Sequence, residues 1–448
     1  MGRKLIMADN YMLKKSKIVL WGLRNISIMA GFVVMSYVSY FATNCLGISA
    51  GVIGALLLAS KLFDGITDLI AGYFVEKTNT KLGKGRPYDL CIIGVWICTV
   101  LMFAVPDIGY IGKCIWLFLT YTLTNSVFFT LLSAAEPVYM MRAIPDKAQK
   151  EFTATLTGLI GVIAAAVGYM IFPVMLDSLG KTQKGWILIA LVIAVPMIFI
   201  GLIRFVSVKE VVPCTVSENK EKIKIRDIMV SLKNNKYIYL LCTALILTTM
   251  VGNIATTVNT YYFNYVIGNV ALSGVIGIIS LVTPFVILLF PSFLKKISLS
   301  RLVSICAVIG ILGCMIRQFS GENLLLILVG SALMTIGTLP LSVYSIVMVN
   351  DVIDYNEKMT GQRMEGILSS FLCFAQKIGM GFAIGGVGLI MGINGFVSSS
   401  SGDNVQQPAS AINAIVSLFG VVPAVLFVGV IILMHFYNID KNIVKQSA

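Results

Sequence analysis

The sequence predicts an all-α integral membrane protein with twelve transmembrane helices in two pseudo-symmetric six-helix bundles. Three observations lead to this prediction: the composition, the spacing of the apolar runs and a charged segment at mid-chain. Of the 448 residues, 57% are hydrophobic and 12% are charged, and the mean hydropathy is +0.90. Soluble domains carry about 25% charged residues. The composition therefore excludes a soluble enzyme and a disordered chain.

A transmembrane helix needs roughly 20 mostly apolar residues, and twelve runs of about this length can be found along the chain. Several runs exceed the minimum, which indicates tilted or broken helices rather than additional spans. The twelve runs lie near 18–46, 50–76, 89–106, 112–140, 152–175, 186–206, 237–267, 271–294, 300–319, 323–350, 365–394 and 409–437.

Lysine and arginine gather in alternate connecting segments. Twenty-seven of the 34 lie in one set of segments, which includes both termini, and only four lie in the other set. Cytoplasmic segments are enriched in these residues, so we expect both termini in the cytoplasm of a multi-pass cell-membrane protein. The net charge of +13 then reflects topology. The lipid bilayer is an expected partner, whereas nucleic acid is not, because no basic domain is present.

A long polar stretch divides the chain almost in half. We predict an N-terminal six-helix bundle over 1–206, a cytoplasmic linker over 207–236, a C-terminal six-helix bundle over 237–437 and a cytoplasmic tail over 438–448. The sequence Gly-Val-Ile-Gly at 51–54 recurs at 274–277, an offset of half the chain. Transporters built from two related halves bind their substrates near the bilayer midplane, between the halves. We expect a monomer.

The second predicted span contains an acidic pair. Asp64 and Asp68 are four residues apart, so both project from one helix face. An ionisable group inside the bilayer costs at least about 2.5 kcal/mol, and two like charges there need a positive group between them. That group is a proton, a sodium ion or Lys61. Two carboxylates and the Thr67 hydroxyl suit a small hard cation. In the alternative interpretation, Lys61 and Asp64 form an ion pair and Asp68 belongs to the cytoplasmic mouth.

Other polar groups within the predicted spans are candidates for binding the solute. Lys377, with Gln376 beside it, lies about a dozen residues into an apolar run, and its alternative role is to satisfy backbone carbonyls at a helix crossing. The spans 18–46, 112–140 and 237–267 are rich in hydroxyl and amide groups, which suit a neutral polyhydroxyl ligand. Hydroxyls can also join helices, and Tyr37 can belong to an interfacial aromatic belt.

An enzymatic function is not indicated. The chain has one histidine, His435, and no clustered nucleophile and base, so we predict no catalytic residue. The nine cysteines form no CxxC pair, and all but Cys214 lie in apolar stretches, where cysteine acts as a small hydrophobe. We therefore predict no cofactor and no metal beyond a coupling ion.

Two motifs carry a resemblance to a known family. The first is Asp64-Gly65-Ile66-Thr67-Asp68 with the following loop, which includes Gly83-Lys84-Gly85-Arg86-Pro87-Tyr88. The second is the stretch from Val349 to Gly366, followed by Phe374-Ala375-Gln376-Lys377. Both resemble the glycoside–pentoside–hexuronide:cation symporter family, the melibiose-permease branch of the major facilitator superfamily. The layout extends over the whole chain, and the motifs span about 60 residues.

The resemblance implies the major facilitator fold, alternating access and a coupled cation, which is Na⁺, Li⁺ or H⁺. It implies that Asp64, Asp68, Thr67 and Thr130 bind that cation. Lys377 matches the family's lysine in the eleventh span. Asp351, Asp354 and Arg363 match charged positions that close the cytoplasmic side.

The chain departs from the sugar-binding members of that family at three positions. Ile28 stands where those members keep an aspartate, and Leu132 or Ser133 stands at a second acidic position. Thr155-Leu156-Thr157-Gly158 replaces a region that contains an arginine. Asn25 and Glu136 are candidates to replace these groups. The expected substrate-binding residues are Lys377, Ser133, Asn25, Gln376 and Tyr37.

The predicted function is cation-coupled symport of a sugar, a glycoside or a related small polar solute. The alternative is an uncoupled facilitator, or an exporter of a lipid-like or peptide-like substrate, on the same fold. An imposed ion gradient distinguishes the two, because it drives accumulation only by a coupled transporter.

Overall fold

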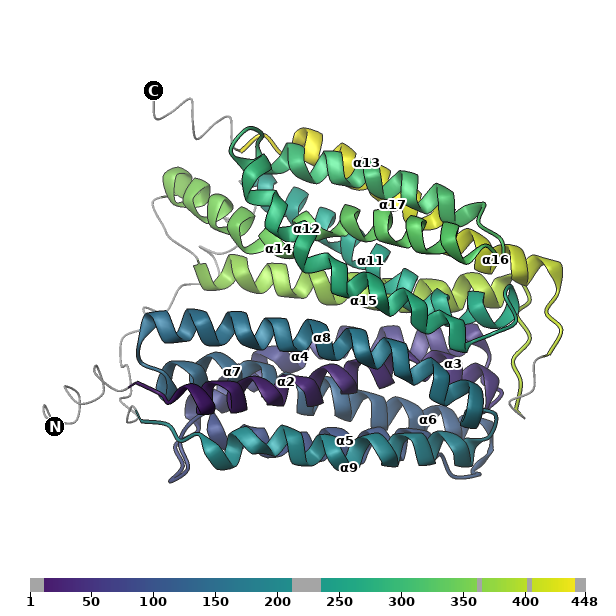
Figure 1. Ribbon diagram of the computed structural model, residues 1–448, viewed down its shortest axis with the longest axis horizontal. Helices are drawn as coiled ribbons and strands as arrows, with labels where there is room; N and C mark the ends of the chain where they lie inside the picture. Colours follow the sequence, from purple (N-terminus) through teal and green to yellow (C-terminus); the bar gives the residue numbers. More distant parts are fainter. Residues whose placement is uncertain (1–11, 212–234, 361–364, 401–404, 440–448) are drawn as a thin grey trace, which may run out of the picture. The chain divides into compact units, whose positions relative to one another are not determined.

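The computed structural model describes residues 12–211, 235–360, 365–400 and 405–439 (Figure 1). Within these ranges the secondary structure is helical, apart from an isolated bridge between Thr80 and Gly83. The all-α prediction is therefore confirmed. Most of the predicted linker, 212–234, lies outside the described residues.

The described chain forms two compact units. The first holds residues 12–211 and 269–281 with a short segment that begins at Val397, and the second holds most of the remainder of the second half. The helices of the first unit are α2 (Lys15–Ser36), α3 (Val38–Asn44), α4 (Ala50–Lys77), η1 (Arg86–Leu90), α5 (Cys91–Phe103), α6 (Gly109–Thr122), η2 (Leu123–Phe129), α7 (Thr130–Ala143), α8 (Lys147–Leu179), α9 (Gln183–Ser207) and η3 (Ala271–Ile276).

The second unit is also a bundle of helices. Helix α12 begins in the first unit and continues in the second. The helices of this unit are α11 (Lys236–Tyr265), α12 (Gly277–Leu294), α13 (Leu299–Gln318), α14 (Leu324–Thr360), α15 (Glu365–Ile393), α16 (Ala409–Phe419) and α17 (Val421–Phe436).

Eleven spans in the described residues are long and apolar enough to cross a membrane. Ten are continuous or broken helices that match predicted runs, and the eleventh runs through η1 and α5 at the predicted third span. Helix α4 matches the remaining run, at 50–76. It has 28 residues and carries Lys61, Asp64 and Asp68 within its length. Its charges lower its apolar character, but its length suffices to span a bilayer.

Three of the long apolar runs are interrupted helices, whereas the two longest, 237–267 and 365–394, are the continuous helices α11 and α15. The first span is interrupted at Tyr37, between α2 and α3. The last is interrupted at Gly420, between α16 and α17, where a Cβ atom would lie 2.6 Å from Gln318. Glycine permits the backbone to approach this closely. The fourth span changes from α-helix to π-helix and back at η2.

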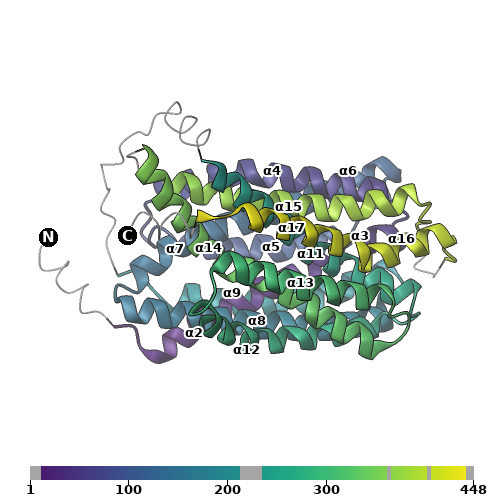
Figure 2. The same cartoon turned by 90° about the horizontal axis from the view of Figure 1, so that it is seen from above.

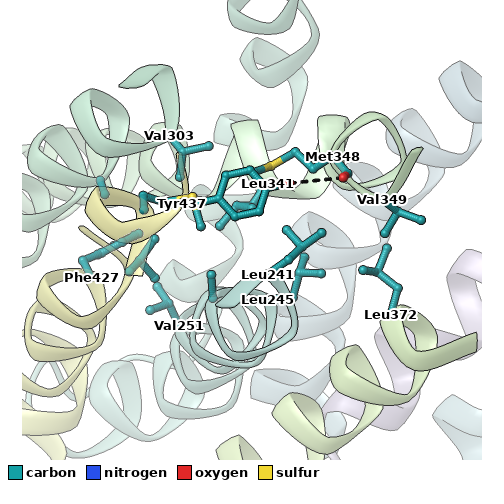
Figure 3. Close-up of a cluster of buried hydrophobic side chains, with 14 of the residues drawn as sticks. Leu241, Leu245, Val251, Val303, Leu341, Met348, Val349, Leu372, Phe427 and Tyr437 are labelled. Carbon is teal, nitrogen blue, oxygen red and sulfur yellow. Dashed lines mark hydrogen bonds between the residues drawn. The ribbon is translucent and has the colours of Figure 1, made fainter. Parts of the chain in front are cut away.

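Apolar side chains fill the interior of each unit. In the first unit, α2 packs against α8 and α9 (Figures 1 and 2), and the rings of Phe103 and Trp186 stack with centroids 5.2 Å apart. In the second unit, α11, α13, α14, α15 and α17 contribute to one buried cluster (Figure 3). Within that cluster, Tyr437 donates a hydrogen bond from its hydroxyl to the carbonyl oxygen of Met348, at 3.2 Å.

Many large apolar side chains face outward. Phe199 on α9 is 71% exposed, and Leu288 on α12 is 72% exposed. Soluble proteins rarely expose apolar surface on this scale. The outward faces of these helices therefore suit contact with lipid.

The loop between α4 and η1 is held by one carboxylate from the end of α9. Glu210 Oε1 accepts hydrogen bonds from the backbone N–H groups of Gly85, at 2.7 Å, and Arg86, at 2.8 Å. Its Oε2 accepts a third from Lys84, at 2.9 Å. Arg142 Nε lies 3.6 Å from the same carboxylate. Charge-assisted bonds of this kind are about twice as strong as neutral ones, so Glu210 ties this loop to two helices.

Candidate functional site: a buried ion pair and an adjacent cavity

The acid-bearing helix α4 faces the π-helical turn η2. A π-helical turn is wider than an α-helical one, and such turns are frequent at functional sites. The backbone N–H of Thr130 donates to the carbonyl oxygen of Asn125, five residues earlier. The wider turn presents Asn125 and Thr130 to α4, where both contact charged side chains.

Asp64 is at the centre of this contact and is only 4% exposed. Its Oδ1 accepts a hydrogen bond from Thr130 Oγ1 at 3.2 Å, and its Oδ2 lies 3.7 Å from Lys61 Nζ. The Lys61 ammonium donates to Asn125 Oδ1 at 3.0 Å and lies over the ring of Tyr121, 5.7 Å from its centroid. A buried charge needs such partners, and here one ammonium and one hydroxyl provide them.

Hydroxyl groups fix α4 against the same span. Thr122 Oγ1 donates to Ser60 Oγ at 2.9 Å, and Ser126 Oγ donates to the carbonyl oxygen of Ser60 at 3.4 Å. Hydrogen bonds between helices inside a membrane contribute about 0.6 kcal/mol each. Ser60 is completely buried, so these contacts set the register between α4 and the π-helical turn.

Of the four predicted cation-site residues, the described side-chain contacts join two directly. Asp64 and Thr130 are in direct contact. The Thr67 hydroxyl donates to the backbone carbonyl oxygen of Asp64, at 3.0 Å, rather than to its carboxylate. Asp68 is partly exposed. The ion pair between Lys61 and Asp64, which the sequence left as an alternative, is formed.

A second charged group lies in the first unit and consists of four side chains, Arg24, Asp89, Glu136 and Arg204, which we term the charge quartet. Arg204 donates from Nε to Asp89 Oδ2 and from Nη1 to Glu136 Oε1, both at 2.8 Å. Arg24 Nε lies 3.2 Å from Asp89 Oδ1, and its Nη1 donates to Glu136. The two guanidinium groups and the two carboxylates balance in charge, as a buried network requires.

A cavity of about 400 Å³ lies beside the charge quartet. Its lining includes both positions at which the resemblance expects an acid, namely Ile28 and the alternatives Leu132 and Ser133. Asn25 also lines it, and its Nδ2 donates to the carbonyl oxygen of Thr157 at 2.9 Å. The structure thus brings together two predicted substrate residues, Asn25 and Ser133.

The cavity wall offers both donors and acceptors to a ligand. The Glu136 side chain is 27% exposed, whereas that of Asp89 is 2% exposed, so Glu136 is the more accessible carboxylate of the quartet. Among the described residues, Arg24 Nη2 and Thr157 Oγ1 are buried lining-residue atoms without a hydrogen-bond partner. Phe32 adds an aromatic face, stacked on Phe129 with centroids 4.5 Å apart.

The remaining predicted site residues lie elsewhere. Tyr37 is buried where the first span breaks, with its ring centroid 4.6 Å from that of Phe172. Gln376 and Lys377 lie on α15, in the second unit, and both are half-buried. Towards the end of α14, Asp351 is half-buried and Asp354 is exposed, whereas Arg363 lies outside the described residues.

Sequence reasoning missed two members of the quartet. Asp89 and Arg204 stand at the ends of predicted spans, where charged residues are ordinary, and they are 115 residues apart. Arg24 was the available signal, since an arginine deep in an apolar run needs acids from other helices. Glu210 gave no comparable signal, because its partners are backbone N–H groups.

Within the described ranges, no three histidine, cysteine, aspartate or glutamate side chains are placed to hold a metal ion together. The described residues thus combine many helices long and apolar enough to cross a membrane, charged groups within those helices and a cavity lined by both charged and apolar side chains, which is the character of a multi-pass membrane transporter.

Comparisons with known proteins identify the family. A family model described as MFS/sugar transport protein matches residues 26–441. The chain therefore belongs to this family. It is a transporter and not an enzyme.

Two relatives and two solved structures are similar over almost the whole chain. The isoprimeverose transporter of Lactiplantibacillus pentosus is 28% identical, over 93% of this chain and 86% of that protein. The putative glycoside/cation symporter YagG of Escherichia coli (strain K12) is 28% identical, over 93% of each chain. A bacterial homolog of the human lysosomal transporter Spinster shares the fold, with a TM-score of 0.69, 13% identity and coverage of 94% of this chain and 95% of that chain. A structure of a proton dependent oligopeptide transporter gives a TM-score of 0.68, with 13% identity and coverage of 96% of this chain and 100% of that chain.

Proposed function

We propose that this protein is a secondary active symporter that moves a sugar, a glycoside or a related small polar solute together with a cation. The observation that carries the proposal is the buried Asp64 carboxylate, which accepts a hydrogen bond from the Thr130 hydroxyl at the end of the π-helical turn. Oxygen ligands suit a small hard cation, and a charge inside a membrane span is a functional candidate by default. Relatives named as a glycoside/cation symporter and an isoprimeverose transporter support the same proposal.

The proposed cation is Na⁺, Li⁺ or H⁺, and its ligands are Asp64, Asp68, Thr67 and Thr130. The Thr67 hydroxyl donates to the backbone carbonyl oxygen of Asp64, so a side-chain rotation is needed before it can join the site. Rotamer changes of this kind are fast.

The proposed solute site includes the cavity beside the charge quartet. A sugar hydroxyl both donates and accepts, so one hydroxyl can accept from Arg24 Nη2 while another donates to Glu136. Asn25 and Ser133 add polar contacts. Lys377, Gln376 and Tyr37 remain candidates from the sequence.

The proposed cycle follows from linkage between the two ligands. Cation binding removes the repulsion between Asp64 and Asp68 and favours close packing of α4 against η2 and α7. This packing shapes the solute site, so each ligand raises the affinity for the other by the same factor. Closure on the outer side and opening of the cytoplasmic side then release both ligands.

Several further features belong to the same proposal. The asymmetry of lysine and arginine favours cytoplasmic termini in the cell membrane. The bundles over 1–206 and 237–437 are proposed to be the two halves whose relative motion gives alternating access, as in other transporters with related halves. Asp351, Asp354 and Arg363 are proposed to close the cytoplasmic side of a monomeric protein.

Uptake into proteoliposomes tests the proposal. An inward gradient of Na⁺, Li⁺ or H⁺ should drive accumulation of a labelled glycoside such as isoprimeverose above its external concentration. Asp64→Asn should abolish the ion dependence, whereas the matched control Asp107→Asn should not, because Asp107 is 94% exposed. Uptake by Asp64→Asn that remains ion-stimulated would refute the site. Equilibration without accumulation, under every gradient, would favour an uncoupled facilitator.

A further inference from the structure

Lys61 lies between Asp64 and Asn125 and makes its shorter contact with the neutral residue, unlike the lysine of an ordinary ion pair. Lys61 precedes Asp64 by three residues on α4, and its side chain is 10% exposed. Its short contact is the hydrogen bond to Asn125, at 3.0 Å, and its distance to the Asp64 carboxylate is 3.7 Å, beyond hydrogen-bond range. The ammonium therefore neutralises Asp64 while a different residue holds it.

The Asn125 side chain is oriented so that its Oδ1 accepts the hydrogen bond from Lys61. Its Nδ2 donates to the carbonyl oxygen of Tyr121, at 3.3 Å, and lies 3.6 Å from Met35 Sδ. These contacts turn Oδ1 towards Lys61. The Tyr121 ring, 5.7 Å from the ammonium, adds a further favourable face for a positive charge. Lys61 thus has partners that do not depend on the Asp64 carboxylate.

We propose that Lys61 is a tethered competitor of the coupling ion. Its ammonium neutralises Asp64 when no alkali cation is bound, and it yields that carboxylate to Na⁺ or Li⁺ while it keeps its hydrogen bond to Asn125. This inference rests on the proposed cation coupling. The Lys61 ammonium balances the charge of the buried Asp64 carboxylate when no ion is bound. By competing with the ion, Lys61 also lowers the affinity of the site enough to permit ion release.

Ion binding to purified protein tests this role directly, with NaCl or LiCl titrated at constant ionic strength against choline chloride. The readout is thermal stabilisation in detergent, checked by isothermal titration calorimetry, so no solute is needed. Lys61→Gln keeps a hydrogen-bonding group near Asn125 but removes the charge. We expect it to lower the half-saturating ion concentration by at least about tenfold, because one like charge beside the ion is lost.

The matched control is Lys113→Gln. The Lys113 ammonium also pairs with an aspartate, Asp107 at 3.0 Å, but at an exposed position. We expect its half-saturating ion concentration to equal that of the wild type. A decrease in both variants would indicate a general change in surface charge and would overturn the proposal.

A second variant tests the role of Asn125, and it should change the half-saturating ion concentration in the opposite direction. Asn125→Ala removes the alternative acceptor, so the ammonium is left with Asp64, and the half-saturating ion concentration should rise severalfold. In the Lys61→Gln background the same substitution should have no effect, since coupling between two residues appears as non-additivity. If Asn125→Ala alone folds poorly, the comparison of Lys61→Gln with the wild type still decides the proposal.

The outcomes separate this proposal from the proposed function. Unchanged or weaker ion binding by Lys61→Gln, with normal binding by the wild type, overturns the competitor role and leaves cation coupling intact. If neither the wild type nor any variant responds to Na⁺ or Li⁺, the competitor role is overturned as well. Ion-driven uptake in proteoliposomes then decides separately whether coupling to a proton survives.

Discussion

The hydrogen bonds of the Glu210 carboxylate predict how far the free energy of unfolding falls when its charge is removed. Glu210→Gln keeps one carbonyl oxygen, which can still accept from Gly85 and Arg86. Its amide group would then face the N–H of Lys84, which now donates to Oε2 at 2.9 Å. A buried donor left without an acceptor costs about 1–3 kcal/mol.

Loss of the charge adds to this cost. Two charge-assisted bonds become neutral ones, a decrease of roughly 0.5–1 kcal/mol each, and Arg142 loses its partner at 3.6 Å. We therefore expect the free energy of unfolding to fall by about 2–5 kcal/mol.

Titration with SDS in mixed micelles, followed by circular dichroism, measures this change. The control is Asp107→Asn, which alters an exposed carboxylate and should change the free energy of unfolding by less than about 0.5 kcal/mol. A loss for Glu210→Gln no larger than that of the control would show that the carboxylate does not hold the loop, and the reasoning would be refuted.

Two further substitutions test the interior of each unit. Asp89→Asn leaves two guanidinium groups against one carboxylate in the charge quartet, so it should lower stability by about 3–5 kcal/mol; unchanged unfolding in SDS would contradict the burial of the quartet. Gly313→Ala places a Cβ atom 2.5 Å from the backbone of α14, which should cost about 1–3 kcal/mol. Gly252→Ala is the control, because its Cβ atom would meet open space; equal stability of the two alanine variants would argue against the close packing of α13 and α14.

Much of the fold is visible in local sequence. The apolar runs predict almost all the spans, because the need to bury backbone polar groups in lipid forces each run into a helix of fixed minimum length. The excess length of several runs predicts tilted or broken helices, and breaks occur at Tyr37 and Gly420, but length does not show which runs break, because α11 and α15 are equally long and continuous. The acidic pair of α4 is equally visible, since charged residues stand out in an apolar context.

The partners of those charges are not visible in local sequence. Asn125 follows Lys61 by 64 residues, and its contact depends on a π-helical turn that hydropathy does not reveal. Arg24 meets Glu136 across 112 residues. Such pairings arise only when helices pack, because helix register and rotation are set by side-chain fit between neighbours.

Local sequence alone shows that this is a helical membrane protein with charged groups in its spans, because the free-energy cost of placing backbone and charged groups in lipid depends on each segment separately. The packing of the helices shows that Lys61 contacts both Asp64 and Asn125, and that Arg24 and Glu136 line a cavity. Lys61 neutralises Asp64 from the same helix, but Asn125, which accepts from Lys61, and the acids that neutralise Arg24 come from other helices, so these pairings are a property of the assembled bundle.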